Sequence, residues 1–267
     1  MFGFETGVRG ILAAVVLTLE PVDEALVAVS HGAQAFAAAL DLFLRLDPAL
    51  ARELHEGRAV KPLTVSLLSG PAPREGGNIR VSPGNRYEWR LTGLSAPVAA
   101  ALLTVSPELG GVRIGSAVFR IASVATRAQE HPEAGRATHD ELMGEAAAGE
   151  RVARVTLNFL TPTTFRQGEV ELPFPLPRLV WGSLLDRWNT WSPAQFLDLK
   201  PLLEQNVVLA NWRGETRRVE LGSRATVGFV GRFTYLVPGG PSGRRAVGGT
   251  SSLRSGRYSW AYHEKRG

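Results

Sequence analysis

The sequence contains no cysteine, and this absence removes several classes of protein at once. Disulfide frameworks, thiolate zinc sites, iron-sulfur clusters and cysteine nucleophiles all need a side chain that the 267 residues do not include. Because 44% of the side chains are hydrophobic, the chain has enough apolar material for one large domain or two small ones. The interior must therefore be held together by packing alone.

Long hydrophobic runs are missing as well. The longest apolar stretch, Ile11 to Leu19, is interrupted by Thr18 and followed by Glu20, whereas a helix that crosses a bilayer needs roughly 20 apolar residues. Glu5 precedes this stretch and no small-x-small cleavage site follows it, so a buried strand is a better interpretation than a signal peptide. We expect a cytoplasmic protein that has no membrane partner.

Lysine is scarce, since 27 of the 30 basic residues are arginine. Planar guanidinium groups match phosphate oxygens and stack on bases, which suits an RNA or DNA partner, while a GC-rich genome would raise the arginine content equally well. Residues 239–267 carry six basic groups and one acidic group, a net charge of +5, and residues 1–238 carry 24 of each sign. A nucleic-acid site in residues 1–238 must therefore come from local clusters of arginine.

The first half of the chain has the hydrophobic pattern of a β-α-β-β-α-β domain. The predicted elements, in order, are a strand at 11–20, a helix around 36–44 with a further turn at 49–55, strands at 64–68 and 86–94, a helix at 97–103 and a strand at 112–124. This order is the signature of a ferredoxin-like domain, whose sheet is a frequent platform for RNA.

The second half repeats the beginning of this pattern. After a polar segment, the sequence predicts a short helix at 140–148, a strand at 152–160, a helix at 177–188 and strands at 206–212 and 227–237. Residues 239–267 contain seven glycines and no sustained apolar period. We predict an α+β fold of two tandem ferredoxin-like (RRM-like) domains, 1–126 and 138–238, a linker at 127–137, and an atypical Gly/Arg-rich tail at 239–267 in place of the last helix and strand.

Four short motifs follow one another along the chain: DPALA with LH at 47–55, KPLTVS at 61–66, FLTPTTFR at 159–166 and GFVGR at 228–232. In this order they resemble the sixth Cas protein family, the endoribonucleases that cut precursor CRISPR RNA within its repeats. The resemblance covers residues 10–237 and implies a role in antiviral defence.

This resemblance implies a metal-independent reaction without a cofactor. A ribose 2′-hydroxyl attacks the adjacent phosphate and leaves a 2′,3′-cyclic phosphate and a 5′-hydroxyl, a reaction that histidine with lysine or arginine can promote. The implied partners are CRISPR repeat RNA, as precursor and as mature crRNA, and other Cas proteins of an effector complex. We also consider a homodimer, because a shortened second domain would leave a strand edge bare.

The chain departs from the family at its end. Members carry a glycine-rich loop between the last helix and the last strand, and only Val247 to Thr250 and Ser255 to Arg257 are loosely similar to it. Two alternatives to the nuclease follow from this departure. One is a non-catalytic RNA-binding subunit of an effector complex, and the other is a product of an altered reading frame.

The candidate catalytic residues are His31 and Lys61. His31 lies near the start of a predicted helix, where free backbone amides attract a phosphate and disfavour a protonated imidazole, so it is a candidate general base. A solvated surface histidine is the alternative, and Ala33 or Gln34 compete for the aligned position. Lys61 precedes Pro62, which extends the backbone, so it fits either a phosphate contact or a solvated strand end. The resemblance suggests a packing role for His55.

Arginines of the second domain are the candidate RNA-binding residues. They are Arg166, Arg187, Arg217, Arg218, Arg224 and Arg232. Together they suggest a stripe for a phosphate backbone, and a solvated arginine face is the alternative. Trp181 and Trp188 are seven residues apart on one helical face, which favours the core over base stacking. Gly228 and Gly231 indicate a bulge or a close backbone approach within a strand.

Overall fold

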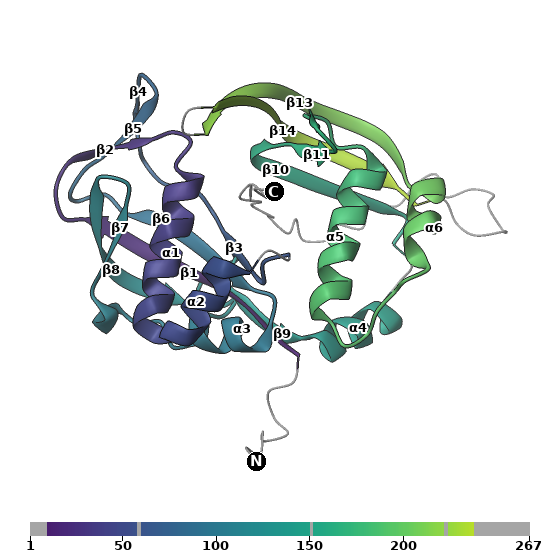
Figure 1. Cartoon of the computed structure of the whole chain (residues 1–267), viewed down its shortest axis with the longest axis horizontal. Helices are drawn as coiled ribbons and strands as arrows, with labels where there is room; N and C mark the ends of the chain where they lie inside the picture. Colours follow the sequence, from purple (N-terminus) through teal and green to yellow (C-terminus); the bar gives the residue numbers. More distant parts are fainter. Residues whose placement is uncertain (1–9, 58–59, 150–151, 222–223, 238–267) are drawn as a thin grey trace, which may run out of the picture. The chain divides into compact units, whose positions relative to one another are not determined.

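The computed structural model describes residues 10–57, 60–149, 152–221 and 224–237 (Figure 1). These residues divide into two compact units, 10–143 and 144–237. Each unit is built around its own antiparallel sheet. The expected α+β fold of two ferredoxin-like domains is confirmed, and the predictions for residues 239–267 lie outside the described residues.

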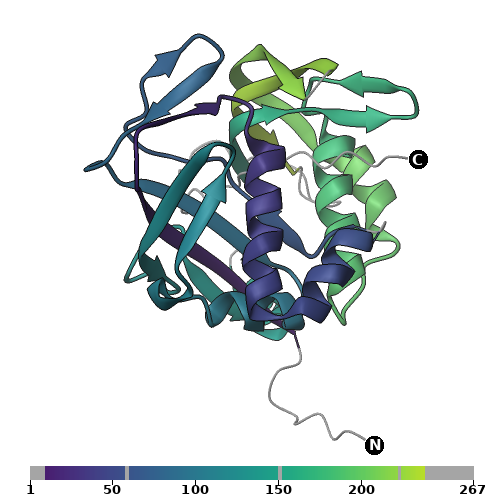
Figure 2. The ribbon, with the colours of Figure 1, turned by 60° about the vertical axis from the view of Figure 1, so that its left-hand side comes forward.

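The first unit has the complete β-α-β-β-α-β order. Its elements are β1 (Ile11–Pro21), α1 (Gly32–Leu46), α2 (Pro48–Glu56), β3 (Leu63–Val65), β6 (Tyr87–Gly93), α3 (Ala96–Leu103), the short 3-10 helix η1 (Pro107–Leu109), β7 (Gly111–Ile114) and β8 (Ala117–Ala125). The strand order β3-β6-β1-β8-β7 places the first strand in the middle of the sheet. Figure 2 shows α1 and α2 side by side over this sheet.

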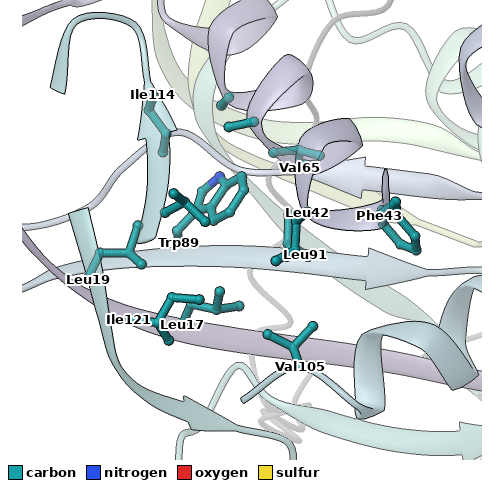
Figure 3. Close-up of a cluster of buried hydrophobic side chains, with 14 of the residues drawn as sticks. Leu17, Leu19, Leu42, Phe43, Val65, Trp89, Leu91, Val105, Ile114 and Ile121 are labelled. Carbon is teal, nitrogen blue, oxygen red and sulfur yellow. The ribbon is translucent and has the colours of Figure 1, made fainter. Parts of the chain in front are cut away.

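The core of the first unit lies between the sheet and its helices. In β6 the buried residues alternate with more exposed ones, as a half-covered strand requires. In β1 the alternation is interrupted at Val16, which is buried like its neighbours Val15 and Leu17. Leu17, Trp89 and Leu91 from the strands pack with Leu42 and Phe43 of α1 (Figure 3). Each such side chain contributes about 1.5–3 kcal/mol by leaving water, so this layer holds the unit together.

The structure differs from the sequence prediction at three places in this unit. The run 112–124, predicted as one strand, is the hairpin of β7 and β8, because the chain turns at residues 115–116. Part of the expected linker forms β9 (Gly135–Thr138), which pairs with β1. A small sheet that the pattern did not predict consists of β2 (Ala25–Ala28), β5 (Asn78–Val81) and β4 (Arg74–Glu75).

The second unit repeats the first four elements of the ferredoxin-like order. After α4 (His139–Ala148), its elements are β10 (Arg154–Thr163), the hairpin β11 (Phe165–Gln167) and β12 (Val170–Leu172), α5 (Pro177–Trp191), α6 (Leu199–Asn206), β13 (Val208–Leu221) and β14 (Arg224–Leu236). The strand order is β10-β14-β13. Phe159, Phe229, Phe233 and Tyr235 of the sheet form its core with Val180 of α5.

Two glycines allow β13 and β14 to approach each other closely. Gly231 pairs with Gly214 and has a backbone φ of +134°. A Cβ atom added to Gly231 would lie 2.5 Å from the Gly214 Cα, and one added to Gly228 would lie 2.8 Å from the Thr163 nitrogen of β10. The close backbone approach that the sequence indicated for Gly228 and Gly231 is therefore confirmed.

Candidate functional site

His31 is buried at the N-terminal end of α1, with 2% of its surface exposed. Its Nδ1 lies 2.7 Å from the Ala28 carbonyl oxygen, and its Nε2 lies 2.9 Å from the Leu68 backbone nitrogen. The Leu68 N–H can only donate, so Nε2 accepts and the proton lies on Nδ1. This neutral tautomer ties β2, α1 and the segment after β3 together.

Burial lowers the pKa of His31, and the contact with the Ala28 carbonyl opposes this change. Both ring nitrogens are engaged with the backbone, so in this arrangement no lone pair faces solvent. The expectation of an accessible histidine at the start of the helix is therefore not met. His31 occupies the expected place in the sequence but acts here as a buried connection between three segments.

The helix α2 begins at a strong capping site. The Asp47 carboxylate accepts hydrogen bonds from the backbone nitrogens of Ala49 and Leu50, at 2.9 and 3.0 Å, and Pro48 occupies the first helical position. Leu50 and Leu54 of this helix are buried in the core of the first unit. The next residue, His55, consequently faces outward.

The imidazole of His55 is exposed. The packing role suggested for this residue is wrong, because neighbouring Leu54 occupies the core and adjacent positions of a helix point in different directions. A sequence signal for this outcome existed, since Leu50 and Leu54 are one helical repeat apart and His55 is not on their face.

Lys61 lies against the C-terminal end of α2. Its Nζ donates hydrogen bonds to the carbonyl oxygens of Leu54 and, at 3.3 Å, of His55. A cation at this end of a helix is favoured, because the last carbonyl groups lack partners within the helix. Partial burial lowers the pKa of the Lys61 ammonium. The structure thus brings the Lys61 ammonium to the main chain of Leu54 and His55.

The candidate arginines of β13 and β14 are separated by the alternation of side chains. Phe233 is in the core on the α5 side of the sheet, so Arg232 lies on the opposite face. The register pairs Arg217 with Gly228 and Arg218 with Val227, which places Arg217 on the same face as Arg232 and Arg218 on the other. All three arginines are exposed, and Arg217 forms an ion pair with Glu215 at 2.6 Å.

The remaining candidate arginines are dispersed. The Nε of Arg166 in β11 donates to the Gly168 carbonyl at 3.0 Å. Arg187 of α5 is half-buried, and burial lowers the pKa of its guanidinium. Arg224 begins β14, and its side chain lies outside the described residues. The five candidates whose side chains the structure describes therefore do not form one stripe on this unit.

Trp181 and Trp188 of α5 are partly buried, whereas Trp212 of β13 is exposed. Trp181 packs edge-on against Tyr235 at a ring separation of 5.5 Å, which confirms its expected place in the core. Trp188 stacks on Phe196 and donates its indole N–H to the Ala194 carbonyl at 2.7 Å. Trp212 is 54% exposed and lies parallel to Phe233.

Neither a cluster of metal-ligating side chains nor a membrane-spanning helix occurs among the described residues. In that part of the chain, no three or more His, Asp or Glu side chains converge as a metal site would need. Within the same residues, every helix is too short or too polar to cross a bilayer.

Comparisons with known proteins converge on one family. A family model described as CRISPR-associated endoribonuclease Cas6 matches residues 157–256. Among solved structures, the product complex of Thermus thermophilus Cas6 (TTHB231) is 32% identical, with 85% of this chain and 86% of that chain covered and a TM-score of 0.64. A second Cas6 product complex (TTHA0078) is 28% identical, with 85% and 84% covered and a TM-score of 0.65.

A complex of the latter protein with a substrate mimic is 27% identical over 86% of this chain and 84% of that chain, with a TM-score of 0.61. No curated protein sequence matches the chain significantly.

Proposed function

Because the chain belongs to the Cas6 family of CRISPR-associated endoribonucleases, we propose that it cuts precursor CRISPR RNA within the repeats without a metal ion. Family membership rests on 32% sequence identity to the protein of a Cas6 product complex, with 86% of that protein's chain covered. The chain is thus a CRISPR RNA processing endoribonuclease. The proposal concerns its reaction and the residues that perform it.

The proposed catalytic pair is His55 with Lys61. The support is geometric: an exposed imidazole lies at the end of α2, where the Lys61 ammonium also lies. Two of the three ammonium N–H groups are directed to the Leu54 and His55 carbonyls, which leaves one donor for a phosphate oxygen. Histidine titrates near neutral pH, so it suits proton transfer from a ribose hydroxyl.

In the proposed reaction, His55 takes the proton of the 2′-hydroxyl as this oxygen attacks the adjacent phosphorus. The bond from phosphorus to the 5′-oxygen breaks, and the leaving oxygen takes a proton from water. Lys61 stabilises the negative charge that develops on the phosphate oxygens. The products are a 2′,3′-cyclic phosphate and a 5′-hydroxyl.

His31 is the second candidate for the base. For this role, one of its contacts with Ala28 and Leu68 has to break, and the ring has to reach solvent. The loss of a hydrogen bond by a buried group costs about 1–3 kcal/mol. The geometry therefore favours His55, and variants of the two histidines distinguish them.

The RNA partner is proposed to be repeat RNA, as substrate and as retained product. Exposed Arg217, Arg218 and Arg232 are proposed phosphate contacts, with Arg166, Arg187 and Arg224 as further candidates from the sequence. Assembly with other Cas proteins, a homodimer and a cytoplasmic location stay predictions.

The direct test is to incubate the purified protein with repeat RNA from the same genome in the presence of EDTA. The expected result is one cut per repeat, with a 2′,3′-cyclic phosphate identified by mass spectrometry. A substrate with a 2′-deoxyribose at the cut position must stay intact. Tight binding of repeat RNA without any cut over hours would instead support the non-catalytic subunit.

A further inference from the structure

Arg213 and Arg232 lie directly opposite each other on neighbouring antiparallel strands. The register pairs Arg213 of β13 with Arg232 of β14, and Arg232 with Asn158 of β10. One cross-strand row therefore contains two arginines and an asparagine. Because Phe233 and Phe159 belong to the core on the α5 side, this row lies on the opposite face of the sheet.

The two guanidinium groups have no carboxylate bound to them in the part of the chain that the structure describes. Within the described residues, neither Arg213 nor Arg232 has an ion-pair or hydrogen-bond partner, although both are exposed. The neighbouring carboxylate on this face, Glu215, is bound to Arg217 at 2.6 Å. Like charges directly opposite each other destabilise a sheet, so the free protein carries an unfavourable pair here.

The backbone also holds the two arginines close together. Their neighbours Gly214 and Gly231 face each other, and a Cβ atom on Gly231 would lie only 2.5 Å from the Gly214 Cα. Directly opposite residues of an antiparallel pair have Cα atoms about 4.5–5.5 Å apart, so both guanidinium groups can reach one tetrahedral anion. The site is built into the strand pairing and does not depend on a loop.

The side chains around the arginine pair are polar except for Val230, which is two residues from Arg232 on the same face and is buried. In the adjacent row, the hydroxyl oxygens of Thr156 and Thr234 lie 2.9 Å from each other. The Asn158 side chain adds amide donors at the end of the arginine row. This composition suits the oxygen-rich backbone of a nucleic acid, which arginine forks bind in a bidentate manner.

From these observations we propose that Arg213 and Arg232 together bind a single backbone phosphate of the repeat RNA. The inference rests on the proposed function and adds Arg213, which the sequence did not single out. Both arginines contact the RNA directly and hold it on the face of the β10-β14-β13 sheet opposite α5. The phosphate neutralises the unfavourable pair, so binding and relief of repulsion are the same event.

The test measures the affinity of the full-length protein for repeat RNA over a range of salt concentrations. The variants are Arg213→Ala, Arg232→Ala, the double variant and Arg213→Lys, with Arg113→Ala of β7 as the exposed control. Each single Ala variant is expected to bind about tenfold more weakly and to lower the salt slope by about one. If both arginines hold one phosphate, the double variant loses little more than each single variant.

Thermal unfolding without RNA provides a second readout. Removal of one guanidinium relieves the repulsion between Arg213 and Arg232. The midpoint temperature of unfolding of each single variant should therefore equal or exceed that of wild type. A lower midpoint together with weaker binding would assign the pair a structural role and overturn the proposal.

Unchanged affinity and salt slope in all variants would also overturn it, even though wild type binds and cuts the RNA. Additive losses in the double variant would mean two separate contacts and reject the shared phosphate. If wild type itself fails to bind repeat RNA, it is the proposed function that is refuted.

Discussion

The Lys61 ammonium donates a hydrogen bond to the backbone carbonyl oxygen of His55 at 3.3 Å. This contact joins the end of α2 to the strand region that follows it, although the two residues are six positions apart in the sequence. It holds the Lys61 ammonium at the C-terminal end of a helix that is anchored by Asp47 at its start and by Leu54 in the core. The proposed charge stabiliser is thereby fixed at the end of the helix that carries the proposed base.

The first prediction separates the two candidate histidines. His55→Ala should slow cleavage by about 100-fold or more, because proton transfer by a positioned base contributes at least this factor. His31→Ala should lower the thermal midpoint but leave the cleavage rate per folded molecule nearly unchanged. Single-turnover cleavage with excess enzyme measures both variants, and exposed Glu53→Gln on α2 serves as the control. The opposite pattern would identify His31 as the base.

The second prediction concerns Lys61. Lys61→Met should slow cleavage by about 100-fold, since it removes the charge next to the reacting phosphate. The same change should lower stability by about 1–2 kcal/mol, because two carbonyl groups lose a charged donor. Asp47→Ala is a matched control: it weakens α2 by about 1 kcal/mol at its other end and removes no reacting group. Equal rates for Lys61→Met and wild type at a temperature where both are folded would exclude the catalytic role.

The third prediction is the effect of pH on stability. Burial lowers the pKa of His31 in the folded protein, so below about pH 6.5 the unfolded chain binds a proton that the folded chain does not. The stability from neutral His31 is present above this pH and falls as the pH decreases, by at most about 1.4 kcal/mol per unit. Urea unfolding between pH 5 and pH 8 should show a steeper fall for wild type than for His31→Gln. Parallel curves for the two proteins would contradict this account.

The fourth prediction tests the glycine contact between β13 and β14. Gly231→Ala should destabilise the protein by about 2 kcal/mol or more, because its Cβ would collide with the Gly214 backbone at a positive φ. Gly144→Ala in α4 has open space around the new Cβ and should stabilise the helix by about 0.5–1 kcal/mol. Calorimetric unfolding of both variants gives the comparison. A neutral Gly231→Ala would show that the strands can separate there without cost.

Much of the fold followed from local patterns. The apolar run of β1, the alternation in β6 and the helical period from Phe36 to Leu44 each lie within one segment, so they predict an element without knowledge of its neighbours. The hairpin of β7 and β8 was missed although its two-residue turn at Gly115 and Ser116 is a local signal. The pairing of β9 with β1 was missed because it joins segments far apart in the chain.

The candidate site was predictable only in part. The sequence identified Lys61 as a candidate. It predicted a packing role for His55 and an accessible position for His31, whereas in the structure His31 is buried and His55 is exposed. Arg213 was overlooked since its importance depends on its register with Arg232. No spacing along the chain contains this relationship.

The sequence by itself determined the main β-α-β-β order of both halves and the glycines of β14 at which strands meet, because these depend on the intrinsic preferences of a few consecutive residues. Tertiary structure decided which histidine is buried, which ammonium contacts which carbonyl and which arginines share a face. Those outcomes depend on packing and strand register between segments far apart in the chain, where a shift of one residue moves every side chain to the other face.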